Sequence, residues 1–132
     1  MNNETTIKNI LDFKNGNGVW SYGKRSGPSQ KTIEDAIKVI NCCTENKLLD
    51  TAAVPDYDDE INISVFKNKK IYIEINISSF RRSSFCRSIN GSDNYYIEVD
   101  NVNQIIQELE KEYVETSNQK NEQKGNNNLP NL

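Results

Sequence analysis

The sequence predicts a two-layer α+β domain in which two N-terminal helices precede a four-stranded antiparallel meander and one helix follows it, in the order α-α-β-β-β-β-α. Apolar and polar residues alternate almost without fault from Ile61 to Ile77, as they do in a half-buried β-hairpin. The segments before and after the predicted sheet carry apolar residues at helical spacing instead. We expect residues 1–114 to form one globular domain, and residues 115–132, which are almost free of apolar side chains, to form a disordered polar tail.

Two helices are expected before the sheet. Ile7, Ile10 and Leu11 follow helical spacing and predict a short helix from about Thr5 to Phe13. Ser29 is a favourable N-cap for a second helix, because its side-chain oxygen can accept a hydrogen bond from a backbone amide of the first turn. The predicted buried stripe of this second helix consists of Ile33, Ala36, Ile37, Ile40 and Cys43.

A connection is expected from Asn46 to Glu60, since this stretch carries Pro55 and a cluster of acidic residues. Within it, we expect Leu48 and Leu49 to tuck into the core. The acidic residues resemble half of a calcium loop, but the glycine and the closing glutamate of an EF-hand are missing. This pattern favours a solvated loop.

The first hairpin is expected to turn at Lys67–Lys70. The polar residues of its strands, including Tyr72 and Glu74, should face away from the core, because the side chains of a strand point alternately to opposite faces.

A second tight hairpin is predicted at Asn90-Gly91, between the extended segments Phe80–Ile89 and Tyr95–Val99. Asparagine and glycine both accept the positive φ that a type I′ turn requires. Asp100 can then cap a last helix. The apolar face of this helix would hold Val102, Ile105, Ile106, Leu109 and Tyr113.

Composition excludes several classes of enzyme. The chain has no histidine, which removes Ser-His-Asp and Cys-His systems and the commonest zinc ligand. Three cysteines, two of them adjacent, make a poor disulfide framework, so reduced thiols and a cytoplasmic location are expected.

The segment from Gly18 to Arg25 falls short of a phosphate-binding P-loop, because arginine stands where the motif has serine or threonine. No apolar run approaches the roughly 20 residues that a bilayer span requires. We therefore predict a protein that is not an enzyme and binds no cofactor and no metal.

Charge is distributed unevenly along the chain, although the net charge is only −3. Six basic residues and one acid lie between Lys67 and Arg87, whereas seven acids and three lysines lie between Glu98 and Lys124. Our preferred interpretation is that these opposite charges compensate each other within the fold.

The stretch from Trp20 to Ala36 carries an aromatic loop with several glycines, then Pro28 and a capped helix. It resembles the W-x-G-x-G-A-x-P loop of small uncharacterised prokaryotic accessory and mobile-element proteins, in which a capped helix, a proline-containing connection and an alternating hairpin follow. The order is similar through about Ile77, with Tyr22 in place of the first glycine and Lys24 in place of the alanine. The resemblance implies a domain of similar order and no established activity, so it assigns no catalytic residue.

The leading functional hypothesis is a small cytoplasmic module that binds another protein, as an inhibitor, immunity or accessory factor does. Its first candidate contacts are Trp20 and Tyr22, with Lys24 and Arg25 beside them. Two interpretations of this loop remain open: the aromatic rings plug the core, or they stand exposed and anchor the partner. Further candidate contacts on the predicted sheet are Tyr72, Arg81 and Arg82.

The alternative hypothesis is a nucleic-acid-binding module. The basic hairpins around Lys67–Lys70 and Arg81–Arg87 would supply the charge, and Tyr72 and Tyr96 would supply aromatic rings on which bases stack. Two glutamates fall on the same strand alternation as these tyrosines, which favours the first hypothesis.

Overall fold

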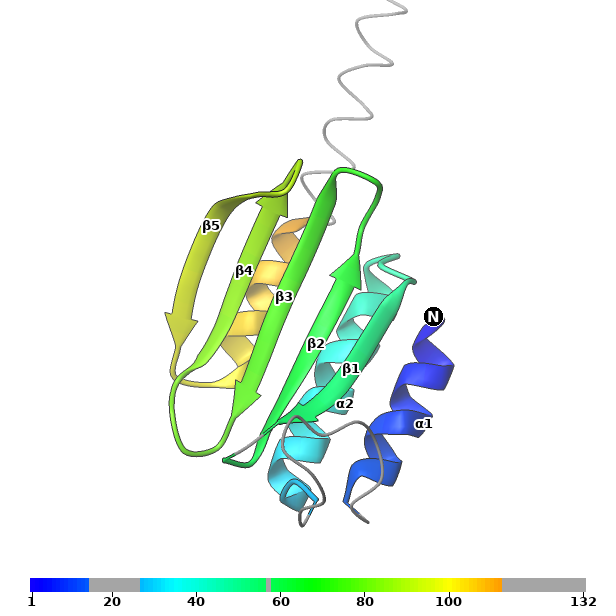
Figure 1. Cartoon of the computed structure of the whole chain (residues 1–132), viewed down its shortest axis with the longest axis vertical. Coiled ribbons are helices and arrows are strands. Elements are labelled where there is room, and N and C mark those ends of the chain that lie inside the picture. The colour runs from blue at the N-terminus through cyan, green and yellow to red at the C-terminus, as the bar shows by residue number, and fades with distance from the viewer. Residues whose placement is uncertain (15–26, 57, 113–132) are drawn as a thin grey trace, which may run out of the picture.

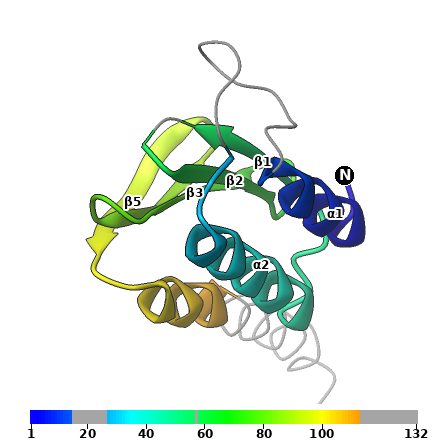
Figure 2. The same cartoon turned by 90° about the horizontal axis from the view of Figure 1, so that it is seen from below.

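The computed structural model of the chain describes residues 1–14, 27–56 and 58–112, which form two layers. One layer is a five-stranded antiparallel sheet in the order β1-β2-β3-β4-β5, and the described helices lie together on one of its faces (Figures 1 and 2). The predicted α+β class and antiparallel meander are confirmed, but the strand count of four is wrong. The predicted tail lies outside the described residues. The elements are α1 (Asn3–Phe13), α2 (Gln30–Glu45), β1 (Thr51–Asp56), β2 (Glu60–Phe66), β3 (Ile71–Ser78), β4 (Ser83–Ile89), β5 (Ser92–Val99) and a third helix at residues 102–112.

Strand β1 is the element that the sequence reasoning missed. It pairs with β2 along its whole length, with Thr51 opposite Val65 and Pro55 opposite Ile61. Pro55 does not prevent this pairing, because β1 is an edge strand and the missing N–H of proline is tolerated at an edge. The expected connection is therefore wrong over the residues of β1.

The sheet turns a row of branched apolar side chains toward the helices. Ile63 lies opposite Ile75 and Val65 lies opposite Ile73, and all four side chains are fully buried. Removing this apolar surface from water is the main favourable term in the folding of such a domain. The predicted alternation is confirmed.

Helix α1 is held against β1 by a buried polar cluster. The Thr51 hydroxyl donates to Asn3 Oδ1 at 2.7 Å, and the Thr6 hydroxyl donates to the Thr51 carbonyl at 2.9 Å. Asn3 Nδ2 also donates to the Leu48 carbonyl at 2.9 Å. Since these bonds draw the first turn inward, α1 begins at Asn3, with Asn2 as its cap, two residues before the predicted start.

Two leucines that were expected to face the core are exposed. Helix α1 buries Thr6, Ile10 and Phe13, and this spacing turns Leu11 outward, where it is 48% exposed. Leu49 is 56% exposed, whereas the neighbouring Leu48 is buried in the core as predicted.

Helix α2 has the predicted cap and the predicted stripe. Ser29 Oγ accepts a hydrogen bond from the Thr32 amide at 3.3 Å. The helix packs against β2 and β3 (Figure 2). Its predicted stripe is buried at Ile33, Ala36, Ile40 and Cys43, and partly buried at Ile37.

The segment that leads into α2 returns to the end of α1. Gly27 lies so close to Phe13 and Lys14 that a Cβ atom at Gly27 would clash with their backbone atoms. The residues that flank the stretch 15–26 are therefore in contact with each other.

The second hairpin turns at Asn90 and Gly91, as predicted, with φ values of 53° and 82°. Strand β4 begins at Ser83 rather than at Phe80, because Phe80 lies in the turn between β3 and β4 and is 75% exposed.

The third helix is capped by Asn101, not by the predicted Asp100. Asn101 Oδ1 accepts from the Gln104 amide at 3.3 Å, and Gln104 Oε1 accepts from the Asn101 amide at 3.2 Å. This reciprocal pair is a capping box. The Asp100 carboxylate instead pairs with Arg82, and Tyr113 lies outside the described residues. None of the described helices has the length and apolar content that crossing a bilayer would demand.

Replacing Ile73 by Asp should abolish cooperative unfolding, because the substitution places an unpaired charge in the centre of the core. We expect a loss of more than about 4 kcal/mol in the free energy of unfolding, measured by urea titration with circular dichroism. The matched control is Glu74→Gln on the exposed side of the same strand, which should change the free energy by less than about 0.5 kcal/mol. A urea unfolding curve of Ile73→Asp that matches the curve of the unchanged chain would show that the strand register is wrong.

Candidate functional site

Among residues 1–14, 27–56 and 58–112, no helix lies on the face of the sheet that points away from α2 (Figure 2). We call it the open face. It is defined by the side chains of Glu60, Asn62, Tyr72, Glu74, Tyr96 and Glu98. Tyr72 is the predicted sheet contact that lies on it.

Charge on the strands is sorted by face. The strand register places every acidic side chain of the five strands on the open face. The single basic residue of the strands, Arg87, follows Phe85 on the opposite alternation and reaches the covered side. The ionisable strand residues of the open face are therefore all acids. The strand carboxylates of this face belong to Asp56, Glu60, Glu74, Asp93 and Glu98.

One end of the open face is a hydrogen-bonded network around Glu60. The Glu60 carboxylate accepts from Asn76 Nδ2 at 3.1 Å and from Ser78 Oγ at 3.2 Å. Arg81 Nε lies 3.1 Å from the same carboxylate, and its Nη2 lies 2.8 Å from Asp58. Arg81, a predicted contact, is thus already paired with acids of its own chain.

The other end of the open face is aromatic. The rings of Phe66 and Tyr72 lie 5.2 Å apart between centroids and are tilted by 39°. The Tyr72 hydroxyl donates to the Glu74 carboxylate and lies 3.1 Å from Ser64 Oγ. Burial and this bond to Glu74 raise the pKa of Tyr72. Tyr96 adds a second exposed aromatic side chain, at 54%.

The structure does not gather the predicted basic residues into one sheet face. Arg82 Nε lies 3.0 Å from the Asp100 carboxylate, and its Nη2 donates to the Glu98 carbonyl at 3.1 Å. Lys67 and Arg87 reach the covered side instead. The prediction that opposite charges compensate each other within the fold is confirmed by these pairs.

A buried ion-pair cluster joins the third helix to the sheet. Glu112 is 2% exposed, and its Oε2 lies 2.7 Å from Lys67 Nζ, while Oε1 pairs with Arg87. Lys67 Nζ also donates to the Glu112 carbonyl at 3.1 Å. A buried carboxylate needs such partners, because leaving the charge unpaired in a dry site costs several kcal/mol (about 3–5).

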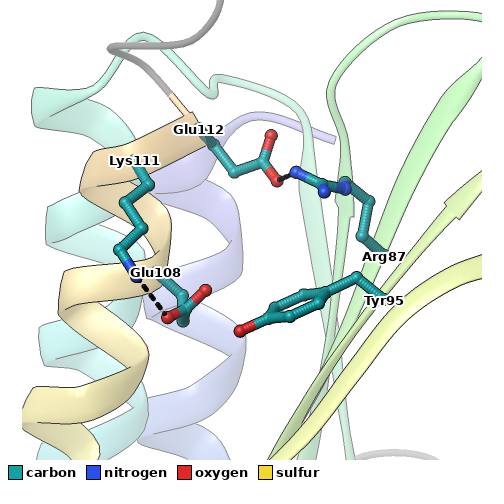
Figure 3. A pocket seen from close by; sticks show the side chains of 5 residues that line it. All are labelled: Arg87, Tyr95, Glu108, Lys111 and Glu112. Atoms are coloured by element: carbon teal, nitrogen blue, oxygen red, sulfur yellow. Dashed lines mark hydrogen bonds and ion pairs between the residues drawn. The ribbon is translucent and has the colours of Figure 1, made fainter.

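A cavity of about 200 Å³ lies beside this cluster, between the third helix and the sheet (Figure 3). Arg87 Cζ lies 5.6 Å from the centre of the Tyr95 ring, and Lys111 Nζ lies 3.1 Å from Glu108. Burial and a hydrogen bond to Glu108 raise the pKa of Tyr95. The lining holds two basic and two acidic side chains, and ion pairs join Lys111 to Glu108 and Arg87 to Glu112. The cavity is lined by Arg87, Tyr95, Glu108, Lys111 and Glu112.

The cysteines differ in exposure. Cys42 and Cys43 are buried residues of α2, and burial raises their pKa to about 11 and about 12. Cys86 lies on the open face, half-buried, where burial and the nearby Asp93 raise its pKa. Within residues 1–14, 27–56 and 58–112, no three cysteine, aspartate or glutamate side chains are grouped so that they could hold a metal ion.

Sequence reasoning predicted Tyr72 and Tyr96 on the outward side of the strands, but it missed Phe66 beside Tyr72 and the inward position of Arg87. Phe66 follows Ser64 on the outward alternation of β2, and Arg87 follows Phe85 on the inward alternation of β4. The period of two in a strand would have predicted the face on which each of them lies. The predicted loop contacts lie outside the described residues. These are Trp20, Tyr22, Lys24 and Arg25.

Comparison with protein-family models, curated proteins and solved structures found no match for this chain. The resemblance of the Trp20 segment to accessory proteins stays a prediction. The geometry of the described residues is the remaining basis for a proposal of function.

Replacing Glu112 by Gln should lower the free energy of unfolding by about 3 kcal/mol, because it leaves Lys67 and Arg87 without their shared carboxylate. Urea titration measures the change. The control is Glu110→Gln, which changes the same charge on the exposed side of the helix and should cost less than about 0.5 kcal/mol. Equal effects of the two substitutions would contradict a stabilising role for the cluster.

Thiol labelling of the folded protein should follow burial. Iodoacetamide at pH 8 should modify Cys86 first and reach Cys42 and Cys43 only after unfolding in guanidinium, as read by mass spectrometry of the peptides. Because the folded state keeps the buried thiols protonated above their ordinary pKa of 9.0, their contribution to stability is present below pH 9 and is lost between pH 9 and about 12. The variant Cys43→Ala should show a shallower loss of stability above pH 9. Labelling of Cys43 as fast as Cys86 would contradict the packing of α2.

Proposed function

We propose that the chain is a small non-enzymatic module that binds another protein, in the manner of an inhibitor, immunity or accessory factor, and that it receives a basic surface of that protein on the open face. The observation that carries the proposal is the sorting of charge on the strands. The acids of the strands face the open side, and their single base, Arg87, lies on the covered side, where it pairs with Glu112.

Surface composition supports a protein partner. Phe66 and Tyr96 are 43% and 54% exposed on the open face, and aromatic residues are enriched in protein interfaces and at their hot spots. The carboxylates of Glu74 and Glu98 stand among them in solvent. Complementary charge speeds association and selects the partner, so an acidic face with exposed aromatic rings fits a basic protein surface.

The nucleic-acid alternative receives less support. Phosphates would meet a face that carries five strand carboxylates, whereas nucleic-acid sites gather lysine and arginine. Arg81 and Arg82, the candidates for phosphate contacts, are paired with Glu60, Asp58 and Asp100.

Two charge-reversal variants with the same net charge test the proposal. Glu74→Lys with Glu98→Lys changes the open face, and Asp12→Lys with Glu110→Lys changes exposed positions on the helices. A partner captured from a lysate of the source cell should be retained by the parent and by the helix variant. It should be lost, or bound at least about tenfold more weakly, by the open-face variant, because like charges would oppose each other.

The capture is repeated with nuclease, and binding to a mixed-sequence oligonucleotide is measured at physiological salt. We expect nuclease to leave the captured protein in place and the oligonucleotide to show no tight binding. Equal retention by both charge variants contradicts the proposal. Tight, steeply salt-dependent oligonucleotide binding that is lost in Arg81→Ala with Arg82→Ala would favour the nucleic-acid alternative.

A further inference from the structure

The two edges of the sheet differ in how they are protected. At the β1 edge, helix α1 packs alongside the strand, Pro55 interrupts the row of donors, and the Thr51 amide donates to the Met1 carbonyl at 3.0 Å. Strand β5 pairs with β4 on one side, and no other strand of the described part of the chain pairs with it. Its eight residues contain no proline and no lysine, the residues that commonly protect an edge. As far as the described residues go, the backbone N–H and C=O groups on the outer side of β5 have no strand beside them and are left to a further strand.

The side chains of β5 form two different rows. On the covered side, Tyr95 and Ile97 pack against the core but are only half-buried, so the edge of the apolar core is partly exposed to solvent. On the open face, Tyr96 and Glu98 are exposed, and Asp93 joins them because the register with β4 shifts between Arg87 and Ser88 and interrupts the alternation of β5. A strand added beside β5 would continue both rows, placing one set of side chains over the core margin and the other beside the carboxylates.

We infer that an extended segment of the basic partner protein binds as a sixth strand on β5, with lysine or arginine side chains on the open face and apolar side chains on the covered side. This inference rests on the proposed function and specifies how the partner is held. Main-chain hydrogen bonds supply affinity, and the two rows supply specificity. The carboxylates of Asp93 and Glu98 complement the basic row.

A second copy of this chain fits the edge less well. Antiparallel pairing of β5 with its own copy would bring the Asp93 and Glu98 carboxylates of both copies onto one face, where no strand residue supplies a positive charge. Like charges across adjacent strands are destabilising. The same carboxylates that attract a basic segment therefore oppose self-pairing.

The test uses a ten-residue peptide of alternating lysine and valine as the probe, with fluorescence anisotropy to measure binding. Two derivatives carry the same charge but are N-methylated on the backbone, one at every lysine and the other at every valine. An added strand presents only one set of its amides to β5. We expect one derivative to lose at least tenfold in affinity and the other to bind within threefold of the parent peptide. Equal affinity of both derivatives, or no binding of the parent peptide, overturns the inference.

Amide hydrogen exchange locates the peptide. We expect new protection at alternating residues of β5 and none in β3. Protection of the outer β5 amides in the free chain would show that the edge is already occupied, by a second copy or by the chain itself, and would overturn the inference.

Charge reversal separates this inference from the proposed function. Glu98→Lys at the edge should weaken binding of the parent peptide at least tenfold, and Glu74→Lys in the central strand, on the same face, should weaken it less than threefold. If both reversals weaken the peptide equally and both N-methylated derivatives bind equally, the open face binds basic ligands but the edge does not pair. If the captured partner is indifferent to reversal of both glutamates together, the proposed function itself fails, whatever the peptide does.

Discussion

The apolar row of the β2–β3 hairpin is the constraint on which the rest of this structure depends. Ile63, Ile75, Val65 and Ile73 are fully buried and face one way, so the hairpin has only one side that water must be kept from. The described helices accordingly lie on that side alone (Figure 2). A sheet that is apolar on both sides would have needed helices on both faces. With this alternation, helices on one face are enough to bury the apolar row.

The strand register and one buried carboxylate together then decide which charges reach the open face. Glu112 holds Lys67 and Arg87 beneath the sheet, and Arg87 is the single base of the strands. The cluster does not need to add net stability to have this effect, since a buried ion pair often does little better than apolar packing. It fixes where the positive charge lies, and the remaining strand charges are all negative.

The parts of this fold that periodicity encodes could be read from the sequence, and those decided by contacts between distant residues could not. The isoleucine alternation, the Ser29 cap and the Asn90-Gly91 turn are local signals, and each appears as predicted. Strand β1 gives no such signal, because a short edge strand with Pro55 is stabilised by its partner β2 and by the buried bonds of Thr51 to α1. The sequence indicated the acidic open face only in part. Lys67 lies in a turn, where no periodicity predicts its direction, and its partner Glu112 is 45 residues away along the chain.

The contact of Gly27 with the end of α1 has a consequence for how this chain can vary. Because Gly27 lies against Phe13 and Lys14, the stretch 15–26 starts and finishes at nearly the same point in space. Closing a longer loop between fixed ends costs little, about 0.6 kcal/mol for each doubling of its length. A connection of another length between Lys14 and Gly27 would therefore close at little cost in free energy, because its two ends already meet.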